Sequence, residues 1–225
     1  MRNIKEINLE TFKFMRDNLY SGAIADILDE KGFRNQAMSS AIRPLTPDTV
    51  VAGWAKTILS ADVYHMPKPG MEYKLEFQAI DSLKKGEVIV WGSNYSEISG
   101  FWGELLTTAA IHRGAIGAIG DSNIRDTKII LKTGFQLFFK GFRPLDSRGR
   151  NDVIAYDCRI ECGGVVVFPG DIAFGDIDGV VIIPAKLAIE VINEACEKVK
   201  RENKVREELK KGMSLPDAWE KYHTI

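Results

Sequence analysis

The stretch Gly114-Ala-Ile-Gly-Ala-Ile-Gly120, followed by Asp121-Ser-Asn-Ile-Arg-Asp126, decides the fold of this 225-residue chain. Small residues alternate with isoleucine in the first half, which is typical of a buried strand with close neighbours on both faces. The chain then turns polar, and Asp121, Arg125 and Asp126 follow within six residues. Because open α/β sheets bind ligands beyond the carboxyl ends of their strands, we expect this polar half to contribute to a site.

Residues 103–113, directly before this stretch, have the spacing of a helix that ends at Gly114. The free backbone N–H groups at its start, from Gly103, Glu104, Leu105 and Leu106, predict an anion site suited to a carboxylate. A helix start and the end of the next parallel strand lie at the same edge of a sheet, so this site and the Arg-Asp pair should meet. The ordinary alternative is that Glu104 only complements the helix dipole.

Arg125 and Asp126 also have two interpretations. A guanidinium beside a carboxylate suits a substrate carboxylate and a hard metal ion. Alternatively, Asp126 caps a helix over residues 126–132 and Arg125 pairs with it at the surface. The position after a buried strand favours the functional interpretation.

The remaining patterns predict short strands mixed with helices, which indicates an α/β sandwich rather than a pure Rossmann sheet. We expect a single domain with a core and N-terminal helices over 1–184 and a C-terminal helical arm over 185–225. Helices are expected at 9–31 (in two pieces), 72–83, 184–211 and 215–222, strands at 41–60 (in several runs), 86–91, 115–120, 135–142, 154–160, 165–168 and 180–183, and loops at 62–70 and 143–151.

Glu202 interrupts an apolar stripe on the terminal helix. The stripe has helical spacing, so a carboxylate there faces either solvent or a polar site on a neighbouring subunit. Its apolar members are Ala188, Ile192, Ala195, Val199 and Leu209.

Composition narrows the function class. The chain carries 30 basic and 31 acidic residues, a net charge of −1, which predicts no nucleic-acid or membrane partner. The segment MRNIKEINLETFKFMRDN is too charged for a signal peptide, and the three cysteines indicate free thiols, so we expect a cytoplasmic protein. No histidine spacing suits zinc, and no nucleophile elbow or phosphate-binding loop is present.

Taken in this order, the motifs resemble one family: the 4-hydroxy-4-methyl-2-oxoglutarate aldolases and their non-enzymatic relatives, the regulators of ribonuclease E activity A. The resemblance implies a layered sandwich of the phosphohistidine-domain (swivelling β/β/α) type that assembles into homotrimers or homohexamers. The motifs are Trp102-Gly-Glu-Leu-Leu, the Gly-x-x-x-x-Arg-Asp loop ending at Asp126, Cys162-Gly-Gly-Val-Val-Val, Pro169-Gly-Asp and Asp176-Ile-Asp-Gly-Val-Val-Ile-Ile-Pro184.

The resemblance also implies roles for individual residues. Asp126 would bind Mg²⁺ or Mn²⁺, with water at most other positions, and Arg125 would bind substrate oxygens. The start of the helix, Gly103 with the backbone amides of Leu105 and Leu106, would hold the carboxylate of the pyruvyl group. Glu104 would orient a water, and Glu202 of a neighbouring subunit would complete the site.

We therefore expect a divalent-metal lyase that cleaves 4-hydroxy-2-oxo acids to pyruvate, or decarboxylates oxaloacetate, through a stabilised enolate. Two alternatives stay open: a non-catalytic regulator of ribonuclease activity, and a related metal enzyme acting on another hydroxy or sugar acid. The loop reads Asp-Ser-Asn-Ile-Arg-Asp where the aldolases usually have Asp-Gly-x-x-Arg-Asp. Residues 63–72 and 143–151 look particular to this member and bear on its substrate.

Overall fold

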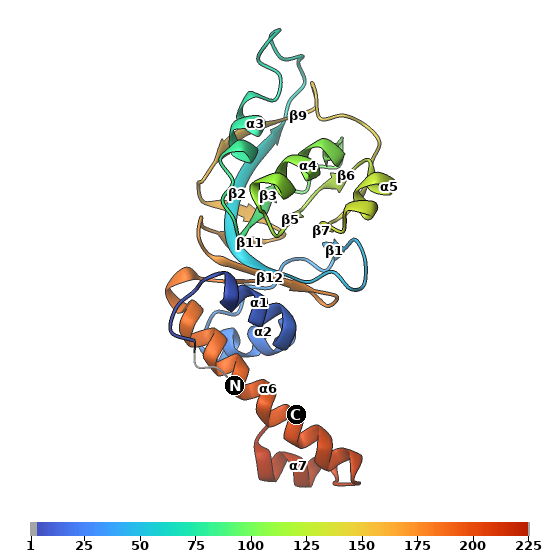
Figure 1. Ribbon diagram of the computed structural model, residues 1–225. Coiled ribbons are helices and arrows are strands. Elements are labelled where there is room, and N and C mark those ends of the chain that lie inside the picture. Colours follow the sequence, from blue (N-terminus) through green and yellow to red (C-terminus); the bar gives the residue numbers. More distant parts are fainter. Residues whose placement is uncertain (1–3, 225) are drawn as a thin grey trace.

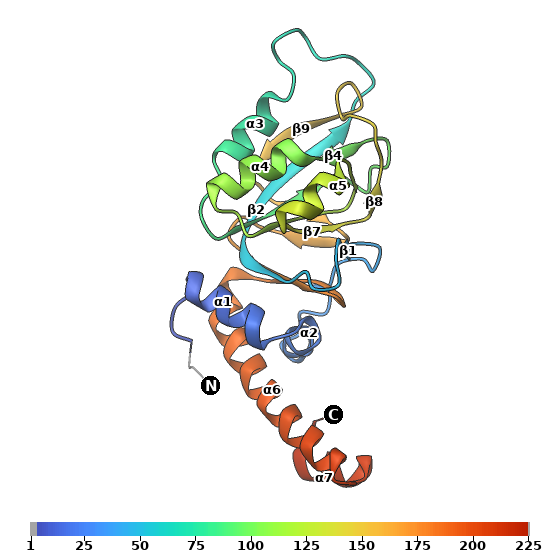
Figure 2. The ribbon, with the colours of Figure 1, turned by 45° about the vertical axis from the view of Figure 1, so that its right-hand side comes forward.

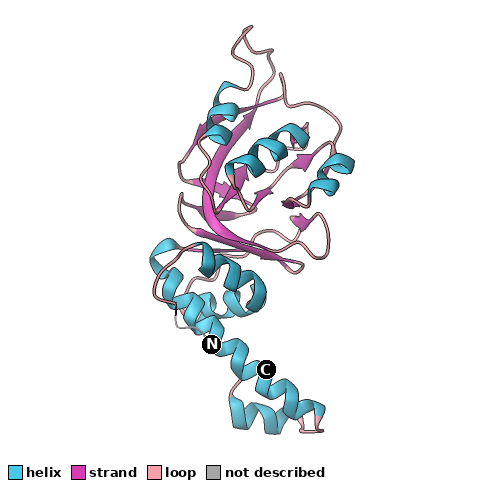
Figure 3. Cartoon of the chain, viewed as in Figure 1, coloured by secondary structure: helices cyan, strands magenta, loops and turns pink. Residues whose placement is uncertain are grey.

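The computed structural model describes residues 4–224 as one mixed α/β domain with a projecting helical arm (Figures 1 and 3). The helices are α1 (Leu9–Asn18), α2 (Ser21–Glu30), α3 (Lys74–Asp81), α4 (Glu104–Arg113), α5 (Thr127–Ile130), α6 (Ala188–Lys210) and α7 (Leu215–Tyr222), with 3-10 turns at Leu131–Thr133 and Ala185–Leu187. The strands are β1 (Arg43–Pro44), β2 (Val51–Asp62), β3 (Glu87–Gly92), β4 (Gly100–Trp102), β5 (Gly117–Gly120), β6 (Asn123–Ile124), β7 (Gln136–Phe139), β8 (Gly141–Phe142), β9 (Asn151–Tyr156), β10 (Ile160–Cys162), β11 (Val165–Val167), β12 (Ile172–Asp176) and β13 (Gly179–Ile183).

The main sheet has the order β1-β7-β5-β3-β2-β12-β13, and β9 also pairs with β2. Strands β2, β3, β5 and β7 are parallel to one another, whereas β1, β9, β12 and β13 pair antiparallel. The long β2 pairs with β12 near its start and with β9 near its end, so it joins the two parts of the sheet. The mixed α/β prediction is confirmed, and the finer assignment to the phosphohistidine-domain type stays a prediction.

Strand β5 is the predicted buried strand, and it lies between β3 and β7 with all four residues buried. Its glycines are required by close neighbours: a Cβ atom on Gly117 would lie 2.5 Å from the carbonyl oxygen of Gln136 and 2.7 Å from Cγ1 of Val51. At Gly120 the same atom would lie 2.5 Å from the ring of Phe139. The alternation of small residues therefore reflects close packing, as predicted.

Three hydrophobic clusters hold the layers together. Helices α3, α4 and α5 cover one face of the parallel strands around Trp91 and Trp102 (Figures 1 and 2). The β10–β11 hairpin contributes to a second cluster with β3 and β5, and Cys162 is buried in it. Helices α1, α2 and the first half of α6 pack against β12 and β13, with Phe12 and Ile192 fully buried.

The predicted strand boundaries differ from the structure in two places. The run 135–142 is divided, because β7 joins the main sheet whereas β8 joins a small sheet of order β4-β6-β8. The run 154–160 is also divided, because Asp157 has a φ of 52° and separates β9 from β10. The small sheet matters for function, since β4 and β6 both lead into the candidate site.

The arm begins at Pro184, where the predicted helix starts. The second half of α6 continues away from the sheet and carries α7 at its end (Figure 2). Trp219 on α7 is about half exposed. Within residues 4–224, no helix is both long enough and apolar enough to cross a membrane.

Candidate active site

Two parallel strands of the small sheet bring the predicted motifs together. Gly100 and Trp102 of β4 pair with Asn123 and Ile124 of β6, and the N–H of Arg125 donates to the carbonyl oxygen of Trp102 at 2.8 Å. Strand β4 leads into α4, and β6 leads directly into Arg125 and Asp126. The predicted meeting of the helix start with the Arg-Asp pair is therefore confirmed.

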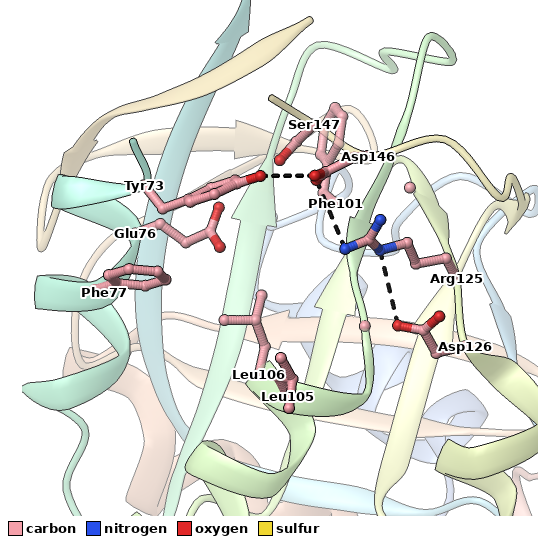
Figure 4. Close-up of a pocket in the computed structure, with 12 residues that line it drawn as sticks. Tyr73, Glu76, Phe77, Phe101, Leu105, Leu106, Arg125, Asp126, Asp146 and Ser147 are labelled. Atoms are coloured by element: carbon pink, nitrogen blue, oxygen red, sulfur yellow. Dashed lines mark hydrogen bonds and ion pairs between the residues drawn. The ribbon is translucent and has the colours of Figure 1, made fainter. Parts of the chain in front are cut away.

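The Asp126 side chain is turned toward the start of α4. The residue occupies the N-cap position of α5 with a φ of 58°, but its side chain makes no capping hydrogen bond there. Instead, Oδ2 accepts from the N–H of Glu104 at 3.3 Å and lies 3.7 Å from Nε of Arg125. The carboxylate therefore does not cap α5, whereas its ion pair with Arg125, the other part of that alternative, is present (Figure 4).

Gly103 allows this approach. It is the N-cap residue of α4 and has no side chain of its own to cap the helix, so the Asp126 carboxylate can reach the N–H of Glu104. A Cβ atom at Gly103 would lie only 2.7 Å from Oδ2 of Asp126. The adjacent Leu105 and Leu106 belong to the first turn of α4, whose N–H groups lack partners within the helix, and both residues line an open cleft.

The cleft has about 570 Å³ of empty space and lies between α3 on one side and the α4 start with Arg125 on the other (Figure 4). Five predicted site residues line it: Gly103, Leu105, Leu106, Arg125 and Asp126. The structure adds four polar residues that the sequence did not single out, namely Tyr73, Glu76, Asp146 and Ser147.

Asp146 and Tyr73 form the upper wall of the cleft. Oδ1 of Asp146 lies 3.7 Å from Nη2 of Arg125, and Oδ2 accepts a hydrogen bond from the Tyr73 hydroxyl at 2.7 Å. Both residues lie in or directly beside the segments 63–72 and 143–151, which the sequence marked as particular to this chain. The sequence therefore pointed to these two segments, but it did not predict the contacts of Tyr73 and Asp146.

The charges of these groups follow from their surroundings. Burial alone would raise the pKa of Asp146, but the hydrogen bond from Tyr73 and the charge of Arg125 outweigh it and lower that pKa. Burial, together with donation to Asp146, raises the pKa of Tyr73 to about 12. Arg125 is therefore held between two carboxylates, Asp126 and Asp146, beside a neutral phenol.

Glu76 is the most perturbed carboxyl group in the cleft. It is 8% exposed, and no other described residue makes a hydrogen bond or an ion pair with its side chain. Burial raises its pKa to about 8; the charges of Asp146 and Asp152 raise it further, and Arg125 lowers it in part. A usable signal was present, because Glu76 shares a helical face with Ala79, Ile80 and Leu83, all of them buried.

Two acidic residues of the sequence motifs lie outside the cleft lining. Oε1 of Glu104 accepts from the hydroxyl of Thr108 at 3.0 Å on the same helix, so only its backbone reaches Asp126. Asp121 is buried and accepts from the N–H and hydroxyl of Ser93 at 2.8 and 2.6 Å. Asp121 therefore fixes the loop and does not face a ligand.

Glu202 lies on α6, in the arm that projects away from the sheet (Figure 1), and it does not line the cleft of the same chain. Its side chain is 16% exposed and 3.6 Å from Nζ of Lys198, and burial raises its pKa. Any role at the cleft therefore requires a second copy of the chain, and this role stays a prediction.

The side chains around the cleft could supply only one or two ligands to a metal ion, with water and substrate as the others. Among residues 4–224, no cluster of three or more His, Cys, Asp or Glu side chains is placed to hold an ion. Mg²⁺ commonly keeps several waters and takes one or two carboxylates plus substrate oxygens. Asp126, with its side chain 42% exposed at the cleft, fits that mode of binding.

The chain is similar to several known proteins. DlpA of Legionella pneumophila is 30% identical over 91% of this chain, which spans about a third of that protein (32%). A Halalkalibacterium halodurans protein named "Putative 4-hydroxy-4-methyl-2-oxoglutarate aldolase" is 29% identical over 78% of this chain and 77% of its own length. A solved structure described as novel cellulases from microbes associated with the gut ecosystem has a TM-score of 0.82 at 30% identity, over 90% of each chain.

A comparison with models of protein families shows which family the chain belongs to. The model of the RraA-like family, described as Aldolase/RraA, matches residues 21–182. This range includes β2 through most of β13, the α4 start and the Arg125–Asp126 pair. The chain belongs to the RraA-like family.

Proposed function

We propose that this protein is a divalent-metal-dependent lyase that cleaves 4-hydroxy-2-oxo acids to pyruvate and decarboxylates oxaloacetate through the same enolate. The observation that carries the proposal is the convergence of Arg125, Asp126 and the first turn of α4, with the N–H groups of Leu105 and Leu106, in one cleft. The aldolase name of the Halalkalibacterium relative supports it.

The start of α4 is suited to the substrate carboxylate. The N–H groups of Leu105 and Leu106 belong to the first helical turn, where the helix dipole also favours negative charge. Arg125 lies beside them and can donate to the 2-oxo oxygen, where negative charge develops as the carbon–carbon bond breaks. Asp126 and Asp146, each 3.7 Å from the guanidinium, hold Arg125 in this orientation.

Asp126 would hold Mg²⁺ or Mn²⁺, with water and substrate oxygens as the other ligands. When bound there, the ion supplies Lewis-acid stabilisation of the enolate charge. The N–H of Glu104 keeps the Asp126 carboxylate at the α4 start, beside the place proposed for the substrate carboxylate.

An anionic substrate suits this cleft better than a neutral glucan. Glycoside hydrolysis requires two carboxyl groups on either side of the scissile bond and a neutral sugar between them. Here a guanidinium and a free helix start occupy one wall, and both attract carboxylates. We therefore do not extend the description of the cellulase structures to this chain.

We also propose that a second copy supplies Glu202 to the cleft, within a homotrimer or homohexamer. In support, Glu202 lies mostly covered on the projecting arm, away from its own cleft. A carboxylate in an apolar stripe fits a contact with a partner better than a contact with solvent alone.

The test is release of pyruvate, coupled to lactate dehydrogenase, from 4-hydroxy-4-methyl-2-oxoglutarate and from oxaloacetate. Each is measured with Mg²⁺, with Mn²⁺ and with EDTA. Release that EDTA abolishes and that Asp126→Ala removes in a folded protein supports the proposal. No pyruvate from either substrate overturns it, and a screen of other hydroxy acids and a ribonuclease pull-down then separate the two remaining alternatives.

A further inference from the structure

Glu76 projects into the cleft from the wall opposite Arg125. Its carboxyl group points from α3 into the space between that helix and the Arg125 side (Figure 4). A 2-oxo acid whose carboxylate lies at the start of α4 and whose oxo group lies at Arg125 extends its remaining carbons toward this wall. Glu76 is therefore placed to meet the hydroxyl-bearing carbon of the substrate.

A purely structural role explains Glu76 poorly. The residue lies on the buried face of α3 with Ala79 and Ile80, and its small exposed fraction, 8%, opens to the cleft. Withdrawing a carboxyl group from water without a hydrogen-bond partner in the protein costs free energy. A carboxyl group held at such a position is typical of a functional site.

Three other polar side chains of the cleft already bind each other or Arg125. Asp126 and Asp146 both face Arg125, and Tyr73 donates to Asp146. The pKa of Tyr73, about 12, keeps its proton in place at neutral pH. Among the described residues that line the cleft, Glu76 is the carboxyl group that makes no hydrogen bond or ion pair with another side chain, and its pKa of about 8 is near working pH.

We propose that Glu76 is the proton-transfer residue of the lyase reaction, moving the proton of the substrate hydroxyl to the carbon that becomes the methyl group of pyruvate. This assignment rests on the proposed function. It replaces none of the roles of Arg125, Asp126 or the α4 start.

The steps balance without any added reagent. The Glu76 carboxylate removes the proton from the C4 hydroxyl, the C4–O bond becomes a carbonyl, and the C3–C4 bond breaks with its electron pair forming the enolate of pyruvate. The carbonyl product leaves. The Glu76 carboxylic acid then returns its proton to C3, which yields pyruvate and restores the carboxylate.

The charged groups around Glu76 allow its carboxyl group both to accept a proton and to return it. Asp146 from the loop after β8 and Asp152 from β9 disfavour the anion, and Arg125 after β6 favours it in part. On its own helix, Tyr73 lies one turn earlier and is bound to Asp146. A group with a pKa near working pH is an effective general base and general acid.

The experiment compares two reactions of the purified protein with Mg²⁺ present. Aldol cleavage needs the hydroxyl proton to be removed, whereas oxaloacetate loses CO₂ without any such step. We follow cleavage by pyruvate formation and decarboxylation by loss of oxaloacetate, for wild type, Glu76→Gln and the control Glu30→Gln. Glu30 is exposed at the end of α2, a helix that packs against β12 and β13 and contributes no residue to the cleft.

We expect Glu76→Gln to lower kcat for cleavage by roughly 10²- to 10³-fold, the range of a lost general base, and to change decarboxylation by less than about fivefold. Wild-type cleavage should rise with pH through an apparent pKa near 8, and the variant should lack this limb. Glutamine matches the shape of the neutral acid, so the variant should fold.

Cleavage that survives in Glu76→Gln within a few-fold overturns the assignment, and so does an equal loss of both reactions in which the pH limb of cleavage is retained. Either result leaves the lyase proposal standing, because wild type still forms pyruvate. Absence of pyruvate from wild type with both substrates overturns the lyase proposal itself and this assignment with it.

Discussion

Asp146 faces Arg125 across the cleft, with Oδ1 3.7 Å from Nη2, although the two residues lie on different loops. The Tyr73 hydroxyl holds the other carboxylate oxygen of Asp146 at 2.7 Å. Tyr73, Asp146, Arg125 and Asp126 thus form one chain of contacts that runs from α3 to α5. The orientation of the guanidinium depends on both of its carboxylate neighbours.

We therefore expect Asp146→Asn to lower kcat/KM for cleavage by about tenfold or more, because Arg125 loses the charge that orients it. Removing this anion should also lower the pKa of Glu76, which Asp146 helps to raise, so the pH limb of cleavage should move to lower pH. Steady-state rates between pH 6 and 9 check both effects. Asp81→Asn, which breaks an exposed pair with Arg113, is the matched control; an unmoved limb would contradict the coupling.

Gly103→Ala tests the close approach of Asp126 to α4. The backbone of Gly103 is extended, with a φ of −143°, so alanine fits the conformation. The added Cβ would lie 2.7 Å from Oδ2 of Asp126 and should displace that carboxylate. We expect Mn²⁺ affinity, measured by calorimetry, to fall by about tenfold. Gly22→Ala, whose Cβ meets nothing closer than 3.7 Å, should leave affinity unchanged; equal affinity of both variants would refute the argument.

The sequence predicted this half of the site because its signals are local. The α4 helix, its Gly114 cap and the Arg125–Asp126 pair are each specified within a few residues, and the order of strands places them at one edge. Tyr73 and Asp146 were missed because their contact joins segments 73 residues apart. The division of residues 135–142 between two sheets was missed for the same reason, since strand partners decide it.

Glu76 was missed for a different reason. Its spacing from Ala79, Ile80 and Leu83 is the same kind of pattern that singled out Glu202, yet Glu76 was not predicted. The sequence does not show which part of the protein lies opposite that face of the helix. Only the folded arrangement shows that α3 borders a cleft with Arg125 on its far wall (Figure 4).

The raised pKa of Glu76 also predicts how stability depends on pH. Folding raises this pKa from 4.5 to about 8, so the folded state binds the proton more tightly than the unfolded state. Between these values, the contribution of Glu76 to the free energy of unfolding should fall by about 1.4 kcal/mol for each unit of rising pH. Urea unfolding of wild type and Glu76→Gln at pH 5, 6.5 and 8, at one protein concentration, measures it. The difference between the two proteins should change with pH, in favour of the variant at pH 8; a constant difference would show that Glu76 is ionised in the folded protein.

The arm provides the last prediction, a site shared between two copies of the chain. Glu202 does not line its own cleft, so the proposed contact is with the cleft of a second copy, and Glu202→Ala should lower pyruvate formation. The variant should stay folded, because Lys198 keeps its ion pair with Asp26 at 3.1 Å. A mixed oligomer of Asp126→Ala and Glu202→Ala chains contains some clefts in which an intact Asp126 meets an intact Glu202 of another chain. Activity should therefore return on mixing, up to a fraction set by the number of such clefts. Mixed oligomers verified by differential tagging that show no return of activity would place Glu202 outside the site, and the arm would then serve assembly alone.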